Sequence, residues 1–135
     1  MPKFPSEEWV ADFHEAINSS EAYAKAATTW EGDFHFTIEP EGEMTKAETI
    51  YVDLWHGKSR CAHLVAGESE EEPEFVIWAP VSAWKRVILK QVDPIQALLT
   101  RQLKLRGNMV KIMKAVKAAQ ELVNCCTMVE SEFPI

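Results

Sequence analysis

The hydrophobic pattern of this chain changes from a helical period to a period of two and back again, which restricts its fold. After Gly32, apolar and polar side chains alternate over residues 34–38 and again over residues 50–55. This alternation is typical of strands with one buried face. Short turns at residues 40–42 and 56–58 favour an antiparallel meander, because parallel strands need long crossovers. Three further strands are predicted at about residues 60–65, 75–78 and 102–106.

Helical periodicity flanks these strands. Ser6 is a suitable N-cap for a first helix, and a short second helix is predicted over residues 21–28. The first helix has apolar residues at spacings of three and four, namely Trp9, Val10, Phe13, Ala16 and Ile17. Ser82 is the expected N-cap of a third helix, and Asp93-Pro94 is a strong start for a fourth. The predicted fold class is α+β, a five-stranded, mainly antiparallel sheet covered on one side by helices.

Residues 103–123 join the last strand to the last helix. A short alternating run stops at Gly107, and one helix is predicted from Asn108 to residue 123, about 24 Å long. Apolar residues follow one side of this helix, with lysines along another: Met109, Ile112, Met113, Val116, Ala119 and Val123 against Lys111, Lys114 and Lys117. Methionine adapts to irregular apolar partners. The segment suits either a wall touching an apolar ligand or an ordinary surface helix.

Length and composition indicate one globular domain over residues 1–135. The chain is 47% hydrophobic and 26% charged, which suffices for a core without metals or disulfides. No window of about 18 uninterrupted apolar residues predicts a membrane span. The first residues lack the apolar region of a secretory signal. Three cysteines without a CxxC spacing are typical of a reducing compartment, so we expect a cytoplasmic location.

The net charge of −7 argues against general affinity for nucleic acid. The charge is uneven, because residues 85–117 carry nine basic residues and one acid. That segment is +8 and the remainder is −15. An acidic stretch at residues 68–74 is expected to be a solvated loop. The basic segment predicts a local positive surface, although both signs of charge would also serve simply to solvate opposite faces.

Signatures of catalysis are missing from the sequence. It contains no HExxH pair, no GxSxG, no phosphate-cradling glycine loop and no dinucleotide fingerprint. His35, His56 and His63 lie near adjacent predicted strands, and a metal cluster built from them is disfavoured. By strand parity, His56 shares the face of the buried residues in its strand. We therefore expect no catalytic residue, no metal and no cofactor.

Large apolar side chains are abundant, with five tryptophans, six phenylalanines and five methionines. For any one of them a dense core is the simpler explanation. Taken together, an aromatic sheet face under a methionine-bearing helix also meets the requirements of an apolar cavity. Ligand pockets are mostly apolar, with few polar groups.

The order of these elements resembles the sterol carrier protein 2 family of lipid-binding domains, from about Phe4 to Cys126. The most specific part is the Asp93-Pro94 helix start, the Leu-x-Leu strand and Gly107-Asn108 entering a Met/Lys helix. The block of residues 30–34, Trp-Glu-Gly-Asp-Phe, is also similar. The family often has glycine before the Leu-x-Leu strand, where this chain has Arg101-Gln102. The chain does not end in a peroxisomal SKL-type signal.

The resemblance implies a five-stranded sheet with helices on one side enclosing an apolar tunnel. It implies non-catalytic binding, and transfer, of a fatty acid, fatty acyl-CoA, sterol or similar lipid. By strand and helix parity, we expect the ligand to contact Phe34, Phe36, Ile50, Val52, Trp78, Leu103, Leu105, Met109, Ile112, Met113 and Val116. The basic residues expected to meet an anionic headgroup or membrane surface are Lys104, Arg106, Lys111 and Lys114.

Two other classes of function stay open from sequence. An enzyme, or an accessory domain of one, would need a polar group in the cavity, and His56, Asp53 and Tyr51 are the candidates. An interaction module would dimerise by packing its methionine-bearing helix against a second copy. The sequence is compatible with a monomer or a dimer.

Overall fold

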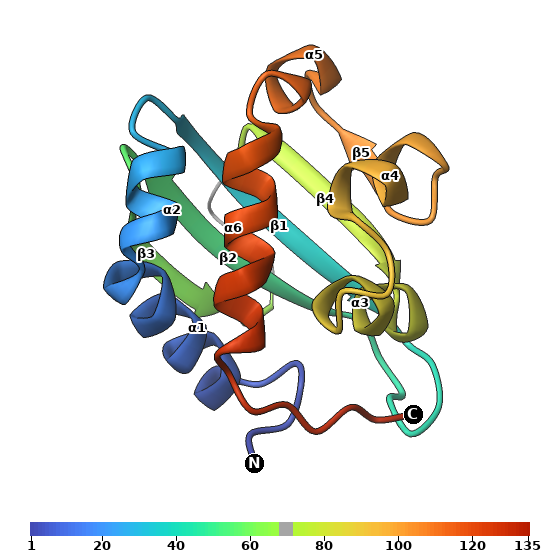
Figure 1. The fold of residues 1–135 in the computed structure, drawn as a ribbon. Coiled ribbons are helices and arrows are strands. Elements are labelled where there is room, and N and C mark those ends of the chain that lie inside the picture. The colour runs from blue at the N-terminus through green and yellow to red at the C-terminus, as the bar shows by residue number, and fades with distance from the viewer. Residues whose placement is uncertain (68–71) are drawn as a thin grey trace.

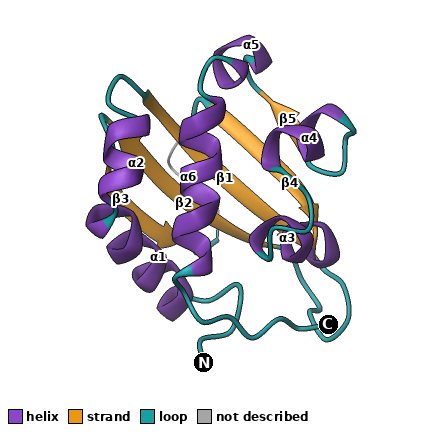
Figure 2. Ribbon diagram, in the orientation of Figure 1, coloured by secondary structure: helices purple, strands orange, loops and turns teal. Residues whose placement is uncertain are grey.

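The computed structural model describes residues 1–67 and 72–135, in which a five-stranded sheet carries all the helices on one face (Figures 1 and 2). The strands lie in the spatial order β3-β2-β1-β4-β5. Their bounds are β1 Glu31–Glu39, β2 Glu48–Trp55, β3 Lys58–Leu64, β4 Phe75–Pro80 and β5 Lys104–Arg106. The α+β prediction is confirmed. The predicted acidic loop falls partly outside the described residues, since residues 68–71 are not among them.

The sheet is mixed rather than a pure meander. β2 pairs antiparallel with β1 and β3, and β5 pairs antiparallel with β4, as expected. β4 pairs parallel with β1, with Phe36 opposite Ile77, so the meander prediction is wrong at this strand. The connection between β3 and β4 spans residues 65–74, long enough to return the chain to the end of the sheet where β1 begins. That return places β4 against the free edge of β1.

The helices begin where the sequence supplies caps, with two exceptions, α3 and α6. Their bounds are α1 Glu7–Ser19, α2 Glu21–Ala26, α3 Val81–Ile88, α4 Pro94–Leu99, α5 Met109–Met113 and α6 Val116–Thr127. The Ser6 side chain accepts a hydrogen bond from the Trp9 N–H, and Asp93 accepts one from the Ile95 N–H. These two predicted caps are confirmed, and both satisfy N–H groups that a helix start leaves unpaired.

The prediction of Ser82 as the cap of α3 is wrong. This helix begins at Val81, and Pro80 holds the N-cap position with no side-chain bond. Ser82 instead donates from its backbone N–H (2.6 Å) and its hydroxyl (3.2 Å) to the Glu41 carboxylate, which follows β1. These hydrogen bonds lower the pKa of Glu41 below its usual value. A carboxylate distant in sequence therefore caps α3 and ties it to β1.

The prediction of one helix from Asn108 to residue 123 is also wrong, because the chain forms two helices there. Asn108 caps α5 through its side-chain oxygen. The backbone of Ala115 then leaves the helical region at φ −121° and ψ 36°, and α6 starts at the next residue. The Lys111 amine bonds the Glu31 carbonyl oxygen at the start of β1. The break at Ala115 lets α5 stay at that end of the sheet while α6 runs across its face (Figure 1).

A tight hairpin turn joins β2 to β3 at His56 and Gly57. Their φ angles are 49° and 82°, both positive, as a type I′ turn requires. Gly57 lies so close to α2 that an added Cβ would be 2.8 Å from the Ala24 Cα. Because the strand has already ended, His56 does not follow the buried parity predicted for it. Its Nε2 lies 2.6 Å from the Glu31 carboxylate at the surface.

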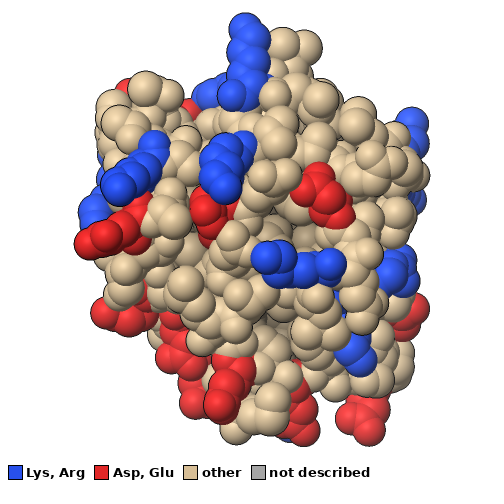
Figure 3. All heavy atoms as spheres, in the orientation of Figure 1, with Lys and Arg blue, Asp and Glu red and all other residues tan. Residues whose placement is uncertain are grey.

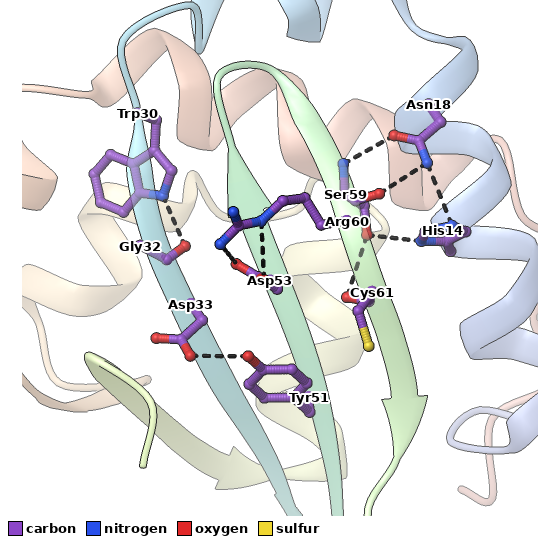
Figure 4. Close-up of polar contacts among 10 residues, drawn as sticks. All are labelled: His14, Asn18, Trp30, Gly32, Asp33, Tyr51, Asp53, Ser59, Arg60 and Cys61. Carbon is purple, nitrogen blue, oxygen red and sulfur yellow. Dashed lines mark hydrogen bonds and ion pairs between the residues drawn. The ribbon is translucent and has the colours of Figure 1, made fainter. Parts of the chain in front are cut away.

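A polar clip holds α1 against β3 (Figure 4). The hydroxyl of Ser59, which is 3% exposed, lies 2.7 Å from His14 Nδ1. The Asn18 side chain accepts from the Ser59 N–H and donates to the Ser59 carbonyl. Each buried polar group at this contact therefore has a partner, as stable packing requires. α1 is thereby anchored over β3 at the edge of the sheet.

Candidate ligand-binding cavity

An apolar cavity lies between the sheet and the helices α2, α4 and α6. The space open to the centre of a water-sized sphere is about 100 Å³. Its lining residues are Tyr23, Trp30, Phe34, Phe36, Leu54, Ile77, Pro94, Leu98, Leu103, Ile112, Ala115, Ala118, Ala119, Leu122 and Val123. No charged side chain of the described residues lines it. Cavities with such walls hold apolar ligands.

The floor of the cavity is an aromatic stack on the sheet. Phe34 and Phe36 point to the same face of β1, and their ring centroids lie 5.2 Å apart. Phe34 also stacks on Trp30 (5.8 Å) and on Phe75 of β4 (5.0 Å). These distances are in the favourable range for aromatic pairs. The stack gives the cavity a rigid, flat floor.

The roof of the cavity exists because alanines face the sheet. Ala115, which precedes α6, and Ala118 and Ala119 within it line the space, and Leu122 and Val123 close its far part. A methyl group fills little of the gap between a helix and a sheet. The empty volume is therefore the consequence of three small side chains, and larger residues at the same positions would occupy it.

Lys111 lies next to Trp30 and Ile112, two residues that line this space. Its amine lies 2.8 Å from the Glu74 carboxylate and also bonds the Glu31 carbonyl oxygen. The same amine sits over the Trp30 ring, 4.9 Å from its centroid, in cation–π geometry. Trp30 and Ile112 both line the cavity, so Lys111 fastens α5 across its margin.

The residues predicted to contact a ligand fall into several places. The cavity brings together four of them, Phe34, Phe36, Leu103 and Ile112. Those packed against the core outside the cavity lining are Ile50, Val52, Leu105 and Val116. Met109 is half-buried, and Met113 is 40% exposed on α5.

Trp78 lies on the opposite sheet face from the cavity. In the sheet, Trp78 pairs with Thr37 of β1 and Lys104 of β5. The preceding residue, Ile77, pairs with Phe36 and Leu105. Phe36 and Ile77 both line the cavity. Alternation along β4 therefore turns Ile77 toward the cavity and Trp78 away from it.

Most of the cavity lining was not in the predicted set. The additional lining residues are Tyr23, Trp30, Leu54, Ile77, Pro94, Leu98, Ala115, Ala118, Ala119, Leu122 and Val123. The alternation along β2 would have predicted Leu54, because this residue shares a strand face with the predicted Ile50 and Val52. The alanine spacing at positions 115, 118 and 119 marks one helix face and is the signal for the roof.

The four basic residues predicted to meet an anionic headgroup or membrane surface also lie in different places. Lys104 and Arg106 are exposed and, by the register of β5 with Trp78 and Val76, project from the sheet face opposite the cavity. Lys111 lies at the cavity margin, and Lys114 is exposed at the end of α5. In Figure 3 basic side chains project around the upper end of the view, where α5 lies, and acidic side chains gather toward the lower edge.

The residues considered for an enzyme do not line the cavity. Tyr51 is buried and donates a 2.9 Å hydrogen bond to Asp33, and burial raises its pKa, with the Asp33 carboxylate adding to the shift. Asp53 pairs with Arg60 (Figure 4), and His56 is in the surface turn. Within residues 1–67 and 72–135, no group of three metal-ligating side chains comes together.

Three thiols, Cys61, Cys125 and Cys126, are free. Burial raises the pKa of the Cys126 thiol, so this thiol is an inert core group. Among the described helices, none combines the length and the apolar character needed to cross a membrane.

The fold and its cavity define a class, an α+β domain that shelters an apolar space between a five-stranded sheet and its covering helices. The sequence matches the SCP-2 sterol transfer family over residues 13–120. The chain belongs to this family, as the resemblance of its motifs predicted. The family and its solved members support a lipid-binding or lipid-transfer domain.

Solved structures agree with this assignment. A crystal structure of sterol carrier protein 2 is 35% identical, with a TM-score of 0.83 over 95% of this chain and 100% of that one. A conserved hypothetical protein from Thermus thermophilus is 36% identical, with a TM-score of 0.84 over 94% of this chain and 90% of that one. The apo form of sterol carrier protein 2 from Yarrowia lipolytica shares the fold at 16% identity, with a TM-score of 0.57 over 89% of this chain and 95% of that one. The curated proteins include no significant match.

Proposed function

We propose that this protein binds a lipid or another apolar molecule in the cavity under α6 and transfers it between membranes without chemical change. The observation that supports the proposal most strongly is the composition of the cavity wall. Fifteen of the described residues surround it, and among these only Tyr23 and Trp30 have polar side-chain atoms. Burying the apolar surface of a ligand there gains about 25 cal/mol per Å².

The proposed ligand contacts come from β1, α5 and α6, and from Leu103 just before β5. Phe34 and Phe36 would form the floor, Leu103 and Ile112 the sides, and α6 the roof. The predicted contacts at Ile50, Val52, Leu105, Met109, Met113 and Val116 would require the cavity to extend when a ligand binds. Trp78 lies on the other face of the sheet and is left out of the proposed contacts. A reducing cytoplasmic compartment remains part of the proposal.

Membrane contact is assigned to α5. Val110 is 61% exposed and Met113 40% exposed, although both are apolar. Lys111 lies beside them on the same short helix, and Lys114 follows it as the C-cap. Apolar side chains flanked by lysines suit the surface of an anionic membrane, which attracts each lysine by about 1 kcal/mol. Since Lys111 fastens α5 at the cavity margin, an anionic surface competing for this lysine would loosen that end.

Titration of delipidated protein with a fluorescent fatty acid tests ligand binding, and denaturing mass spectrometry of the purified protein tests for a bound lipid. Saturable binding at a 1:1 ratio is expected. Non-saturable binding at micromolar probe, without any co-purified lipid, would contradict the proposal.

The membrane contact is tested by sedimentation with phosphatidylcholine vesicles with and without phosphatidylglycerol. Lys114→Gln is expected to reduce binding to the anionic vesicles. The matched control is Lys25→Gln, which removes an exposed lysine from α2 instead. Equal losses in the two variants would refute the assignment to α5.

A further inference from the structure

A polar pocket adjoins the apolar cavity, between α6 and the segment that joins α3 to α4 (Figure 1). Most of its exposed wall is polar, in contrast to the wall of the cavity. Pro94 and Val123 line both spaces, so these two side chains form a common wall between them. Eight of the described residues line the polar pocket, and five of them have polar side chains, namely Lys90, Asp93, Lys117, Gln120 and Asn124.

Two hydrogen bonds join α6 to the opposite wall of the polar pocket. The Lys90 amine donates to Asn124 Oδ1 at 2.7 Å, and the Gln120 side-chain amide donates to Asp93 Oδ1 at 3.0 Å. The other Asp93 oxygen accepts from two N–H groups at the start of α4, so this carboxylate is fully engaged. An ammonium group has three donors, and within residues 1–67 and 72–135 Lys90 uses one of them.

The backbone holds Lys90 in a conformation that favours glycine. Its φ is 61°, and it ends α3 in a Schellman motif. In this motif the Lys90 N–H donates to the Val87 carbonyl and the Gln91 N–H to the Arg86 carbonyl. Glycine is the usual residue at such a position because it has no Cβ to strain. A lysine that keeps a strained backbone at the wall of a pocket points to a function for its side chain.

We propose that this polar pocket binds the carboxylate head of an amphiphilic ligand through the Lys90 amine, while the ligand's chain passes between Pro94 and Val123 into the apolar cavity. The inference rests on the proposed function and adds the class and the place of the head group. Two lysines and one aspartate give the lining a net charge of +1, which complements a monoanion rather than a dianionic phosphate. Lys117 adds its charge from the rim, where its side chain is 73% exposed and its amine lies 3.6 Å from Glu121.

The amine of Lys90 is better suited to this role than that of Lys111, which also lies near the cavity. Lys111 already holds the Glu74 carboxylate at 2.8 Å and bonds the Glu31 carbonyl oxygen. Lys90 forms no ion pair among the described residues, and its one hydrogen bond is to an uncharged amide. A carboxylate therefore binds Lys90 without first displacing another anion, and the new hydrogen bond is charge-assisted.

The test compares octanoate with 1-octanol, which has the same chain length and an uncharged head. Binding is followed by NMR, from the Leu122 methyl groups in the cavity and the Asn124 side-chain amide in the polar pocket. Both ligands should shift the Leu122 signals, and octanoate should shift the Asn124 amide more than octanol does. Lys90→Gly is expected to weaken octanoate about fivefold and octanol less than twofold.

Arg101→Gly is the matched control for Lys90→Gly. Arg101 is exposed, its φ is 62°, and it does not line either space, so its replacement removes one cation and relieves the same backbone strain elsewhere. This variant should leave both affinities within twofold. Both glycine variants should keep the Tm of the ligand-free protein within about 4 °C, because glycine adopts the positive φ without strain.

Equal octanoate affinities in Lys90→Gly and Arg101→Gly would refute the head-group site. Equal losses of octanoate and octanol in Lys90→Gly would refute it as well, because the charge of the head would then be irrelevant. In either case octanol binding to the wild-type protein would leave the proposed function intact. Failure of both ligands to bind the wild-type protein would refute the proposed function, and the head-group site with it.

Discussion

Replacing Ala119 by leucine adds three carbon atoms to the roof of the cavity. The cavity volume of about 100 Å³ corresponds to about 2 kcal/mol of lost stability at roughly 24 cal/mol per Å³. Burying three carbons at about 0.8 kcal/mol each also gives about 2 kcal/mol. Ordering the leucine side chain costs about 0.5–1 kcal/mol. We therefore expect Ala119→Leu to raise the free energy of unfolding by about 1–2 kcal/mol, or the Tm by about 4–8 °C.

Chemical and thermal unfolding of the ligand-free protein measure this change. The matched control is Ala83→Leu, which adds the same atoms to a buried alanine of α3 that does not line the cavity. Overpacking at such a site typically costs about 1–3 kcal/mol, so the control should be destabilised. A ligand should then raise the Tm of the wild-type protein and not that of Ala119→Leu, because the filled cavity no longer binds it.

The sign of the Ala119→Leu effect decides whether the cavity exists in solution. If the variant loses stability as Ala83→Leu does, the space under α6 is already filled. A ligand would then have no space to occupy there, and the proposed ligand site would be refuted.

Three further variants test separate parts of the structure. Lys111→Met should change the free energy of unfolding by less than about 1 kcal/mol, since its ion pair is half-exposed, yet raise the ligand dissociation rate severalfold in stopped flow. Gly107→Ala should lower the Tm, because φ is +142° and an added Cβ would lie 2.5 Å from a Phe75 ring carbon. The lowered pKa of Glu41 means that its contribution to stability is complete above its unfolded pKa near 4.5 and is lost as the pH falls through its folded pKa. Glu41→Gln should therefore flatten the loss of stability that denaturant titrations measure as the pH falls below about 4.5.

Local chemistry in the sequence predicted most of the fold. Alternation placed β1 and β2 with the correct buried residues, and Ser6 and Asp93 capped their helices as expected. Such signals depend on near neighbours in the chain. The parallel pairing of β1 with β4 does not depend on near neighbours in the chain. It depends on where the chain returns to the sheet after residues 65–74.

The cavity was harder to predict for a physical reason. Large apolar residues of α5 and the sheet were predicted to contact the ligand. An empty space, however, forms where side chains are small. Ala115, Ala118 and Ala119 create the roof, and their effect depends on the distance between α6 and the sheet. The break before α6 contains no glycine or proline from which it could be predicted. It occurs next to α5, whose Lys111 contacts β1.

The proposed function requires an apolar ligand to occupy the space between the sheet and α6. Isotope-filtered NOEs between unlabelled 1-hexanol and ¹³C-labelled protein measure that occupancy directly. We predict NOEs to methyl groups of Leu103, Ile112 and Leu122, which line the cavity, saturating at one ligand per protein. NOEs confined to exposed residues such as Val110 and Leu99, without saturation, would contradict the account.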